Sequence, residues 1–382
     1  MKRAAAAAIS LMTGLAMLTG CSRAEVEETI QPLVADAIEE SDSEAEAVKE
    51  EDESPLIPEI DTDIKIYAGS RIAVVSKCVK GEYWKMVKKG MEDAVKEINK
   101  AYGYKKDDQI TMTFEGPDNE EDVETQINTI DAVIAENPDV LCISASDMDS
   151  CEAQLEAAKE NRIPVIAFDS NVAEKKLVKA YRGTDNVQVG KMAAYQLGSA
   201  LGKMGKVAVF SAQQKTKSVQ DRVEGFMNNI GKYGDIEVVE TIYSDQVDDM
   251  EASMKEVLEK YPTLDGVFCT NADITEMYLN LEKSDEHDAP ALVGVDATTK
   301  QQEAIRNGEE IGCVSQQPYA MGYQTIWAAV ETTAPKKSVV IEKNVLSNPA
   351  WIDADCLDDP DYSGYLLSLI HISEPTRLLS IS

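Results

Sequence analysis

The chain contains few of the residues from which catalytic sites are usually built. Only two of its 382 residues are histidines, His287 and His371. His287 lies in the polar segment 284–288, where a solvated loop position is its simplest role. No G-x-S-x-G, G-x-x-x-x-G-K-S/T or G-x-G-x-x-G motif occurs, so the usual nucleophile and phosphate-binding turns are missing. We therefore expect neither an enzyme nor a bound cofactor.

The seven cysteines form no C-x-x-C pair and no spacing suited to zinc. Cys151 and Cys356 are expected to be surface thiols. The other four in the body of the chain lie within or at the end of apolar, strand-like runs, where a free thiol behaves as a small buried hydrophobe: Cys78, Cys142, Cys269 and Cys313. We therefore expect no metal site and no disulfide bond.

The chain also lacks a basic segment, with 37 Lys and Arg against 69 Asp and Glu and a formal net charge of −32. Binding to a nucleic-acid backbone requires a positive patch, so we expect no nucleic-acid partner. Residues 24–62 alone contain fifteen acidic residues and one lysine. A segment with this much like charge and little apolar surface stays extended and unfolded. We therefore expect residues 21–69 to form a disordered linker.

The N-terminus carries an apolar stretch, residues 4–18, that is too short to span a bilayer. Lys2 and Arg3 precede it, a layout typical of a secretory signal. The stretch ends in Leu18-Thr19-Gly20-Cys21, which resembles the lipobox of bacterial lipoproteins. The resemblance implies that residues 1–20 are removed and that a lipid on Cys21 anchors the chain to the outer face of a membrane. The alternative is an ordinary signal peptide followed by a chance cysteine.

From Arg71 to about residue 343, short apolar runs alternate with longer amphipathic segments. This alternation predicts an α/β fold with parallel sheets. We expect strands at 72–76, 110–114, 140–144, 165–168, 207–211, 236–243, 266–269, 292–295 and 311–315. We expect helices at 83–102, 119–136, 148–161, 186–202, 218–233, 247–261 and 319–331.

Polar side chains stand at the carboxyl ends of four of the expected strands, three directly after the strand and one, Asn271, a residue later. They are Asp169, Asn271, Asp296 and Gln316. Ligands bind beyond the carboxyl ends of parallel strands, because the loops converge there and helix N-termini point outward. Any one of these residues could instead only cap a helix. Four such ends on one chain favour a ligand site.

These strand ends and the segments between them resemble the ribose-binding-like family of periplasmic sugar-binding proteins, the soluble receptors of ABC sugar importers. The resemblance covers roughly residues 71–344. Tyr83 and Trp84 occupy the place of the family's aromatic pair. The remaining matching segments, in order, are 163–169, 184–191, 222–226, 270–273, 293–296 and 315–318.

The resemblance implies a fold of two doubly wound parallel-sheet lobes joined by three hinge crossovers. The hinges would lie near Thr184 and Asp185, near Gln317 and near Asn344. The N-terminal lobe would comprise residues 70–184 and 317–343. The C-terminal lobe would comprise residues 185–316 and 344–365.

The resemblance also implies a sugar bound between the lobes. Aromatic rings would cover its apolar faces, carboxylates would accept its hydroxyl protons, a guanidinium would donate, and amide side chains would do both. The implied ligand-binding residues are Tyr83, Trp84, Asp169, Arg222, Asn271, Asp296 and Gln316.

Two departures from the family pattern leave the ligand open. Lys80-Gly81-Glu82 stands where the family has Asn-Pro, and Ser170 stands where an arginine often follows the first aspartate. A different sugar, a sugar derivative or a small charged ligand would each fit these changes.

The expected function is that of a monomeric, extracytoplasmic receptor that delivers a monosaccharide to an ABC transporter permease. A receptor that signals to a membrane kinase or chemoreceptor is one alternative. A transcription regulator of the lactose-repressor family shares the core, but its DNA-binding helices have no counterpart in the acidic N-terminal segment. A glycosidase that uses Asp169 and Asp296 as paired carboxylates is a further alternative.

The C-terminal segment has a separate interpretation. Residues 367–377 resemble the translation of a sequencing adapter. We therefore interpret residues 366–382 as an artefact of sequencing. The alternative is a genuine apolar tail.

Overall fold

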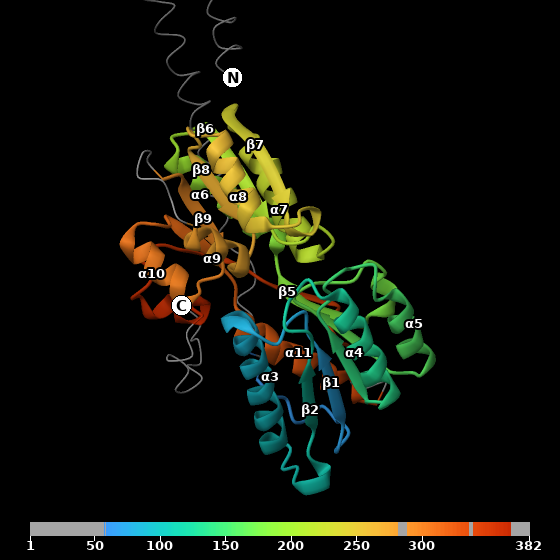
Figure 1. The fold of residues 1–382 in the computed structure, drawn as a ribbon. Coiled ribbons are helices and arrows are strands. Elements are labelled where there is room, and N and C mark those ends of the chain that lie inside the picture. The colour runs from blue at the N-terminus through green and yellow to red at the C-terminus, as the bar shows by residue number, and fades with distance from the viewer. Residues whose placement is uncertain (1–56, 58, 282–288, 336–338, 368–382) are drawn as a thin grey trace, which may run out of the picture. The chain divides into compact units, whose positions relative to one another are not determined.

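The computed structural model describes residues 57, 59–281, 289–335 and 339–367. These residues form two six-stranded sheets (Figure 1), which confirms the expected α/β fold with two parallel-sheet lobes. The signal sequence, Cys21, most of the acidic linker, His287 and His371 lie outside the described residues. Within the described residues, no helix combines the length and apolar character of a membrane span.

The first sheet has the strand order β11-β5-β4-β3-β1-β2, and all its neighbouring strands are parallel. Its strands are β1 (Arg71–Val75), β2 (Thr111–Glu115), β3 (Val140–Ile143), β4 (Val165–Phe168), β5 (Ala180–Thr184) and β11 (Asn344–Ser347). The helices packed on it are α3 (Gly81–Ala101), α4 (Val123–Ala135), α5 (Glu152–Glu160) and α11 (Pro318–Thr333).

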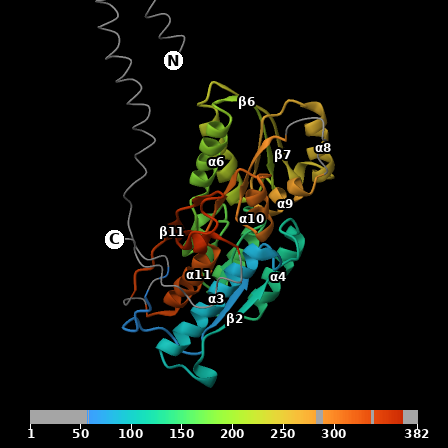
Figure 2. The ribbon, with the colours of Figure 1, turned by 90° about the vertical axis from the view of Figure 1, so that its left-hand side faces the viewer.

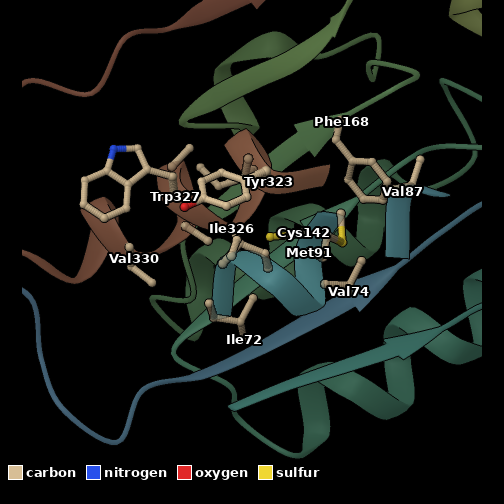
Figure 3. Packing of buried hydrophobic residues seen from close by; sticks show 14 of the residues in the cluster. Ile72, Val74, Val87, Met91, Cys142, Phe168, Tyr323, Ile326, Trp327 and Val330 are labelled. Atoms are coloured by element: carbon tan, nitrogen blue, oxygen red, sulfur yellow. The ribbon is translucent and has the colours of Figure 1, made fainter. Parts of the chain in front are cut away.

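The core of this lobe follows from the alternation of side chains along its strands. Ile72 and Val74 of β1 face α3 and α11, whereas Ala73 and Val75 face α4 and α5. Figures 1 and 2 show α3 beside α11 on one face of the sheet. Figure 3 shows side chains of that face, from the sheet and from both helices: Ile72, Val74, Val87, Met91, Tyr323 and Ile326.

The second sheet has the order β12-β10-β9-β8-β6-β7, with only its edge strand β12 antiparallel to its neighbour. Its strands are β6 (Met204–Ser211), β7 (Asp235–Tyr243), β8 (Gly266–Cys269), β9 (Ala291–Val295), β10 (Gly312–Ser315) and β12 (Ala350–Ile352). Its helices are α6 (Asn186–Ala200), α7 (Lys217–Ile230), α8 (Met250–Lys260), α9 (Ala272–Asn280) and α10 (Thr299–Asn307). Four short 3₁₀ helices complete the described elements: η1 (Lys106–Asp108), η2 (Lys175–Leu177), η3 (Ser244–Gln246) and η4 (Pro360–Tyr365).

Helices α6 and α7 pack with their backbones in direct contact. A Cβ atom added at Gly190 of α6 would lie 1.9 Å from the carbonyl oxygen of Arg222 on α7. A Cβ atom added at Gly225 of α7 would lie 2.1 Å from the carbonyl oxygen of Val187 on α6. The two glycines therefore allow a separation that no larger residue permits, and this contact positions the middle of α7 against the start of α6.

The chain passes between the sheets three times, and two of the passages lie where the sequence places them. Thr184 ends β5 and Asp185 caps α6 by accepting a hydrogen bond from the Gln188 backbone N–H. Gln317 precedes α11. The third passage comes later than expected, because Asn344 is the first residue of β11, which completes the edge of the first sheet beside β5. Residues 344–347 thus belong to the first lobe, and the crossing follows Ser347.

Several elements are absent from the sequence-based prediction. These are β5, α9, α10, β11 and β12. The strands among them are short or carry few apolar residues, so no regular alternation marks them in the sequence. Their stability comes from pairing with a neighbouring strand. The two helices each span only nine residues, which offers little periodicity to detect.

The burial of the cysteines differs from the expectation at one position. The four that were expected in the core are buried. Cys151 was expected at the surface, but it is only 2% exposed, because it precedes α5 and packs with that helix against the first sheet. Cys356 is half-buried. All six described cysteines are free thiols.

Both ends of the described chain pack against the lobes. Ile60, Ile64 and Ile66 contact the core beside α3, and the backbone oxygen of Ile64 accepts a 2.7 Å hydrogen bond from Tyr102. The packed part of the chain therefore begins before residue 70, inside the segment expected to be a linker. Leu367 is buried, and its N–H donates to the Ala297 oxygen at 2.9 Å.

Candidate ligand-binding site

Residues of both lobes, many of them at the carboxyl ends of strands, line a cavity of about 780 Å³. This volume is in the usual range of small-molecule sites, about 300–1,000 Å³. The first lobe contributes side chains from α3 and the end of β4, and the second from α7 and three strand ends. The cavity brings together all seven residues selected from the sequence: Tyr83, Trp84, Asp169, Arg222, Asn271, Asp296 and Gln316.

Asp169 and Asp296 occupy equivalent positions in the two lobes. Each directly follows a strand, β4 or β9, and each has a left-handed backbone, with φ of 55° and 72°. Aspartate adopts this conformation more readily than most residues, yet it still stores strain. Such strain is found mostly at functional sites. The sharp turn directs each carboxylate away from its strand and into the cavity.

The Asp169 carboxylate is buried and accepts four bonds from the protein. Its Oδ1 accepts from the Tyr83 hydroxyl at 2.7 Å, and its Oδ2 from Ser144 at 2.9 Å and Ser170 at 3.1 Å. The Lys77 ammonium lies 2.9 Å from the same Oδ2. Burial alone would raise the pKa of Asp169, but Lys77 and the hydrogen bonds outweigh it and lower that pKa. Asp169 is therefore ionised at neutral pH.

Arg222 is the cation of the second lobe. Its Nε donates to Asn186 at 2.7 Å, and its Nη1 donates to the backbone oxygen of Thr270 at 2.8 Å. Asp296, buried beside it, accepts a 2.7 Å hydrogen bond from Gln316. Burial raises the pKa of Asp296, and the positive charge of Arg222 partly offsets this rise. Each lobe thus combines a buried carboxylate with a buried cation, Asp169 with Lys77 and Asp296 with Arg222.

Tyr83 and Trp84 bring aromatic surface to the cavity from the start of α3. Their rings meet edge to face with centroids 5.2 Å apart, and Trp84 meets Phe168 in the same way at 6.4 Å. The Trp84 indole N–H donates to Glu120 at 2.7 Å. Both rings are therefore held rigidly, as an apolar contact surface for a ligand requires.

Asn271 has a structural task as well as a place on the cavity wall. Its side-chain oxygen accepts a 3.0 Å hydrogen bond from the Ile274 N–H and so caps α9. The capping interpretation therefore holds for this residue, while its amide N–H₂ group makes no bond to the described protein. Asn271 can both start a helix and donate into the cavity.

The charged residues of the cavity that were not selected from the sequence include Lys77, Glu120 and Asp273. Lys77 lies two residues beyond β1, so the strand-end rule that selected the other residues could have found it. Asp273 lies on the cavity wall, where burial and then the negative charges of Glu120 and Glu276 raise its pKa to about 7. In total, ten carboxylates and three cationic side chains line the cavity.

The described residues provide no cluster of three or more histidine, cysteine, aspartate or glutamate side chains suited to a metal ion. The carboxylates of the deep part of the cavity are instead bonded to protein donors. Chemically, this arrangement of alternating donors and acceptors can bind an uncharged, polyhydroxylated molecule.

Known proteins with related sequences are solute receptors. The chain is 25% identical over 220 residues to the ribose import binding protein of Bacillus subtilis, a match that spans 58% of this chain and 71% of the relative. It is 24% identical over 211 residues to the xylitol-binding protein of Mycolicibacterium smegmatis, spanning 55% of this chain and 60% of that relative.

Solved structures share the fold over most of the chain. An ABC transporter solute-binding protein from Agrobacterium vitis with bound D-fucose is 26% identical, with a TM-score of 0.70, and the match covers 78% of this chain and all of that one. The family model of the periplasmic binding protein domain matches residues 72–337. That segment runs from the second residue of β1 to a point beyond β10 and α11, and it contains all seven selected residues. The chain therefore belongs to the family of periplasmic binding protein domains.

Proposed function

We propose that this chain is an extracytoplasmic, lipid-anchored receptor that binds a monosaccharide-type ligand and delivers it to an ABC importer. The observation that carries this proposal is the cavity lined by both lobes, where rigid aromatic rings stand beside a carboxylate and a cation from each lobe. A sugar ring offers apolar C–H faces to aromatic rings, and its hydroxyl groups both donate and accept hydrogen bonds.

The relatives support the ligand class. The curated ones carry names of ribose, xylitol and D-allose receptors. Solved relatives hold D-fucose and D-arabinose, at 26% and 25% identity. These ligands share a size of five or six carbons and a rim of hydroxyl groups, and both fit the chemistry of the cavity.

Binding without chemical conversion is the simplest use of these carboxylates. A glycosidase needs one protonated acid and one ionised partner. Here Lys77 keeps Asp169 ionised, and Asp296 is hydrogen-bonded to Gln316 and lies near Arg222. Both carboxylates are thus bonded to protein donors, so we assign the pair to ligand recognition.

We place the hinges of this receptor at Thr184 and Asp185, at Gln317 and in the crossing that follows Ser347. Each of these segments is a single strand-to-strand or strand-to-helix connection. Ligand binding would favour a closed arrangement, which a permease can distinguish from the open one. The receptor would act as a monomer.

The ligand class is tested by a thermal-unfolding screen of the mature protein with D-ribose, D-arabinose, D-fucose, D-allose and xylitol. For a micromolar site, a ligand at one hundred times its Kd stabilises the folded state by about 2.7 kcal/mol, and we expect a clear rise in Tm with at least one of them. L-Leucine and adenosine serve as controls. A rise with a control but with none of the sugars would contradict the proposal.

The lipid anchor is tested separately. We expect Cys21→Ser to shift the protein from the membrane fraction to the soluble exported fraction, because two acyl chains are what makes anchoring stable. Immunoblots of both fractions give the readout, and Cys356→Ser is the matched control that leaves the distribution unchanged. Retention of Cys21→Ser in the membrane fraction would refute lipidation at this residue.

A further inference from the structure

One short segment of the second lobe makes a series of bonds to the first lobe. Residues 213–218 join β6 to α7 and include the first two residues of that helix. Within the part of the chain that the structure describes, this segment takes part in four hydrogen bonds to the first lobe, at 2.6 to 3.1 Å. They join Gln213 Nε2 to the Glu120 oxygen, the Met148 N–H to the Lys215 oxygen, Thr216 Oγ1 to the Ser146 oxygen, and Ser218 Oγ to Ser170 Oγ.

The partners of this segment in the first lobe come from three loops, each beyond the carboxyl end of a strand. Glu120 follows β2, Ser146 follows β3 and Ser170 follows β4. Ser146 and Ser170 are fully buried, and Thr216 and Ser218 are each only 2% exposed. Hydrogen bonds that are shielded from water in this way are stronger than exposed ones. Separation of the lobes would break them.

Thr216 is used for this contact rather than for its own helix. It is the N-cap residue of α7, where a threonine side chain normally accepts a hydrogen bond from the helix backbone, yet it forms no such bond. Thr298, at the same position of α10, does cap its own helix by accepting from the Gln301 N–H. The Thr216 hydroxyl instead donates to the Ser146 oxygen of the other lobe.

The contact also links the two halves of the ligand site. The Ser170 hydroxyl donates to Asp169 at 3.1 Å, so Ser218 is the donor in the 2.6 Å bond between the two serines. Ser218 and Arg222 are four residues apart on α7, and both line the cavity. Residues at this spacing lie on the same face of a helix. The bond between the lobes therefore helps to set the position of the Arg222 guanidinium relative to the Asp169 carboxylate.

We propose that segment 213–218 holds the lobes together in the ligand-binding arrangement, and that its bonds set how long a bound ligand stays. This inference rests on the proposed function. The bonds form when the lobes meet, so they act after the ligand has entered between them. Loss of one bond therefore speeds dissociation and leaves association nearly unchanged. Thr216 is a positioning residue, since it does not line the cavity.

Cross-linking of the ligand-free protein tests the contact itself. In a variant with Ser170→Cys and Ser218→Cys, two sulfur atoms replace hydroxyl oxygens that lie 2.6 Å apart, which is within reach of a disulfide. With copper phenanthroline as the oxidant, we expect the cross-link to form and the further change Thr216→Val to slow it at least fivefold. Thr325→Val is the matched control, because Thr325 is also buried but its hydroxyl donates to Met321 within α11.

Two outcomes of the cross-linking would overturn the proposal. One is a yield no higher than that of the two single-cysteine variants, which would show that the serines do not meet. The other is a rate in the Thr216→Val background equal to that in the Thr325→Val background, which would show that the Thr216 bond does not hold the lobes together.

Stopped-flow tryptophan fluorescence, to which Trp84 of the cavity wall contributes, tests the effect on the ligand. The probe is the one among D-ribose, D-arabinose, D-fucose, D-allose and xylitol that raises the Tm of the wild type most. We expect Thr216→Val to raise koff at least tenfold while kon stays within threefold, with a ligand-free Tm close to that of Thr325→Val. Gln213→Ala, which removes a second bond of the segment, should act in the same direction.

An unchanged koff in both Thr216→Val and Gln213→Ala would overturn the proposal. A wild type that binds none of the five sugars would instead contradict the proposed function. The cross-linking rates need no ligand, so they still decide whether segment 213–218 holds the lobes together.

Discussion

Replacement of Arg222 by methionine is expected to weaken sugar binding more than 100-fold and to lower the free energy of unfolding by about 3–5 kcal/mol. The guanidinium is buried and bonded to Asn186 and to the Thr270 oxygen. Its removal leaves those acceptors without their donor and leaves Asp296 without the cation that offsets its burial. Methionine keeps a similar apolar volume, so the loss reports the charge and hydrogen bonds. Isothermal titration and denaturant unfolding measure the two effects.

The destabilisation of Arg222→Met depends on pH with a definite sign. The pKa of Asp296 is already raised in the folded state, and loss of Arg222 raises it further. A carboxyl group whose folded pKa is raised favours the folded state below its unfolded pKa and loses that contribution as pH rises through the folded value. The difference in stability between wild type and variant should therefore grow from acid to neutral pH.

The control for this experiment is Arg306→Met on α10. Arg306 forms an exposed ion pair with Asp358 at 3.2 Å, and exposed pairs contribute about 0–1 kcal/mol. We expect its binding and stability to match those of the wild type at each pH. Sugar affinity of Arg222→Met within threefold of the wild type would exclude Arg222 from the binding site.

The strand-end residues of the site are predictable because a local pattern marks them. An apolar run gives the strand, and a polar residue directly after it lies at the carboxyl edge of a parallel sheet whatever the rest of the fold. Asp169, Asp296 and Gln316 satisfy this rule, Asn271 stands one residue later, and the structure places all four on one cavity. Nothing beyond β-strand periodicity and sheet topology is needed to find them.

The strand-end rule could also have found Lys77, but the sequence does not show that its ammonium is buried and paired, because its environment is assembled from distant parts of the chain. Lysine is almost never fully buried unless it is paired, and the partners here follow β4 and lie in the loop before α4. The same limitation explains Cys151 and β11. The position of each depends on contacts with residues that are distant in sequence, as β11 depends on its pairing with β5. A local sequence pattern does not reveal such contacts.

Substitution of Gly190 by alanine is expected to cost about 3 kcal/mol of stability, although alanine is the better helix former by about 1 kcal/mol. The new Cβ atom would lie 1.9 Å from the Arg222 carbonyl oxygen and 2.6 Å from the Phe226 backbone nitrogen. Both atoms belong to the backbone of α7, so no side chain can rotate to make room. Helix α7 must move away from α6, and this helix carries the guanidinium of the second lobe.

The same substitution should therefore weaken sugar binding at least tenfold, even though Gly190 does not line the cavity. Unfolding in denaturant and calorimetric titration measure the two effects on one sample. Gly234→Ala is the matched control, because a Cβ atom there meets no neighbour within 4 Å. A Gly190→Ala protein that is as stable as Gly234→Ala would show that α6 and α7 are not held at backbone contact. Wild-type affinity with reduced stability would instead show that the position of α7 does not set the position of the Arg222 side chain.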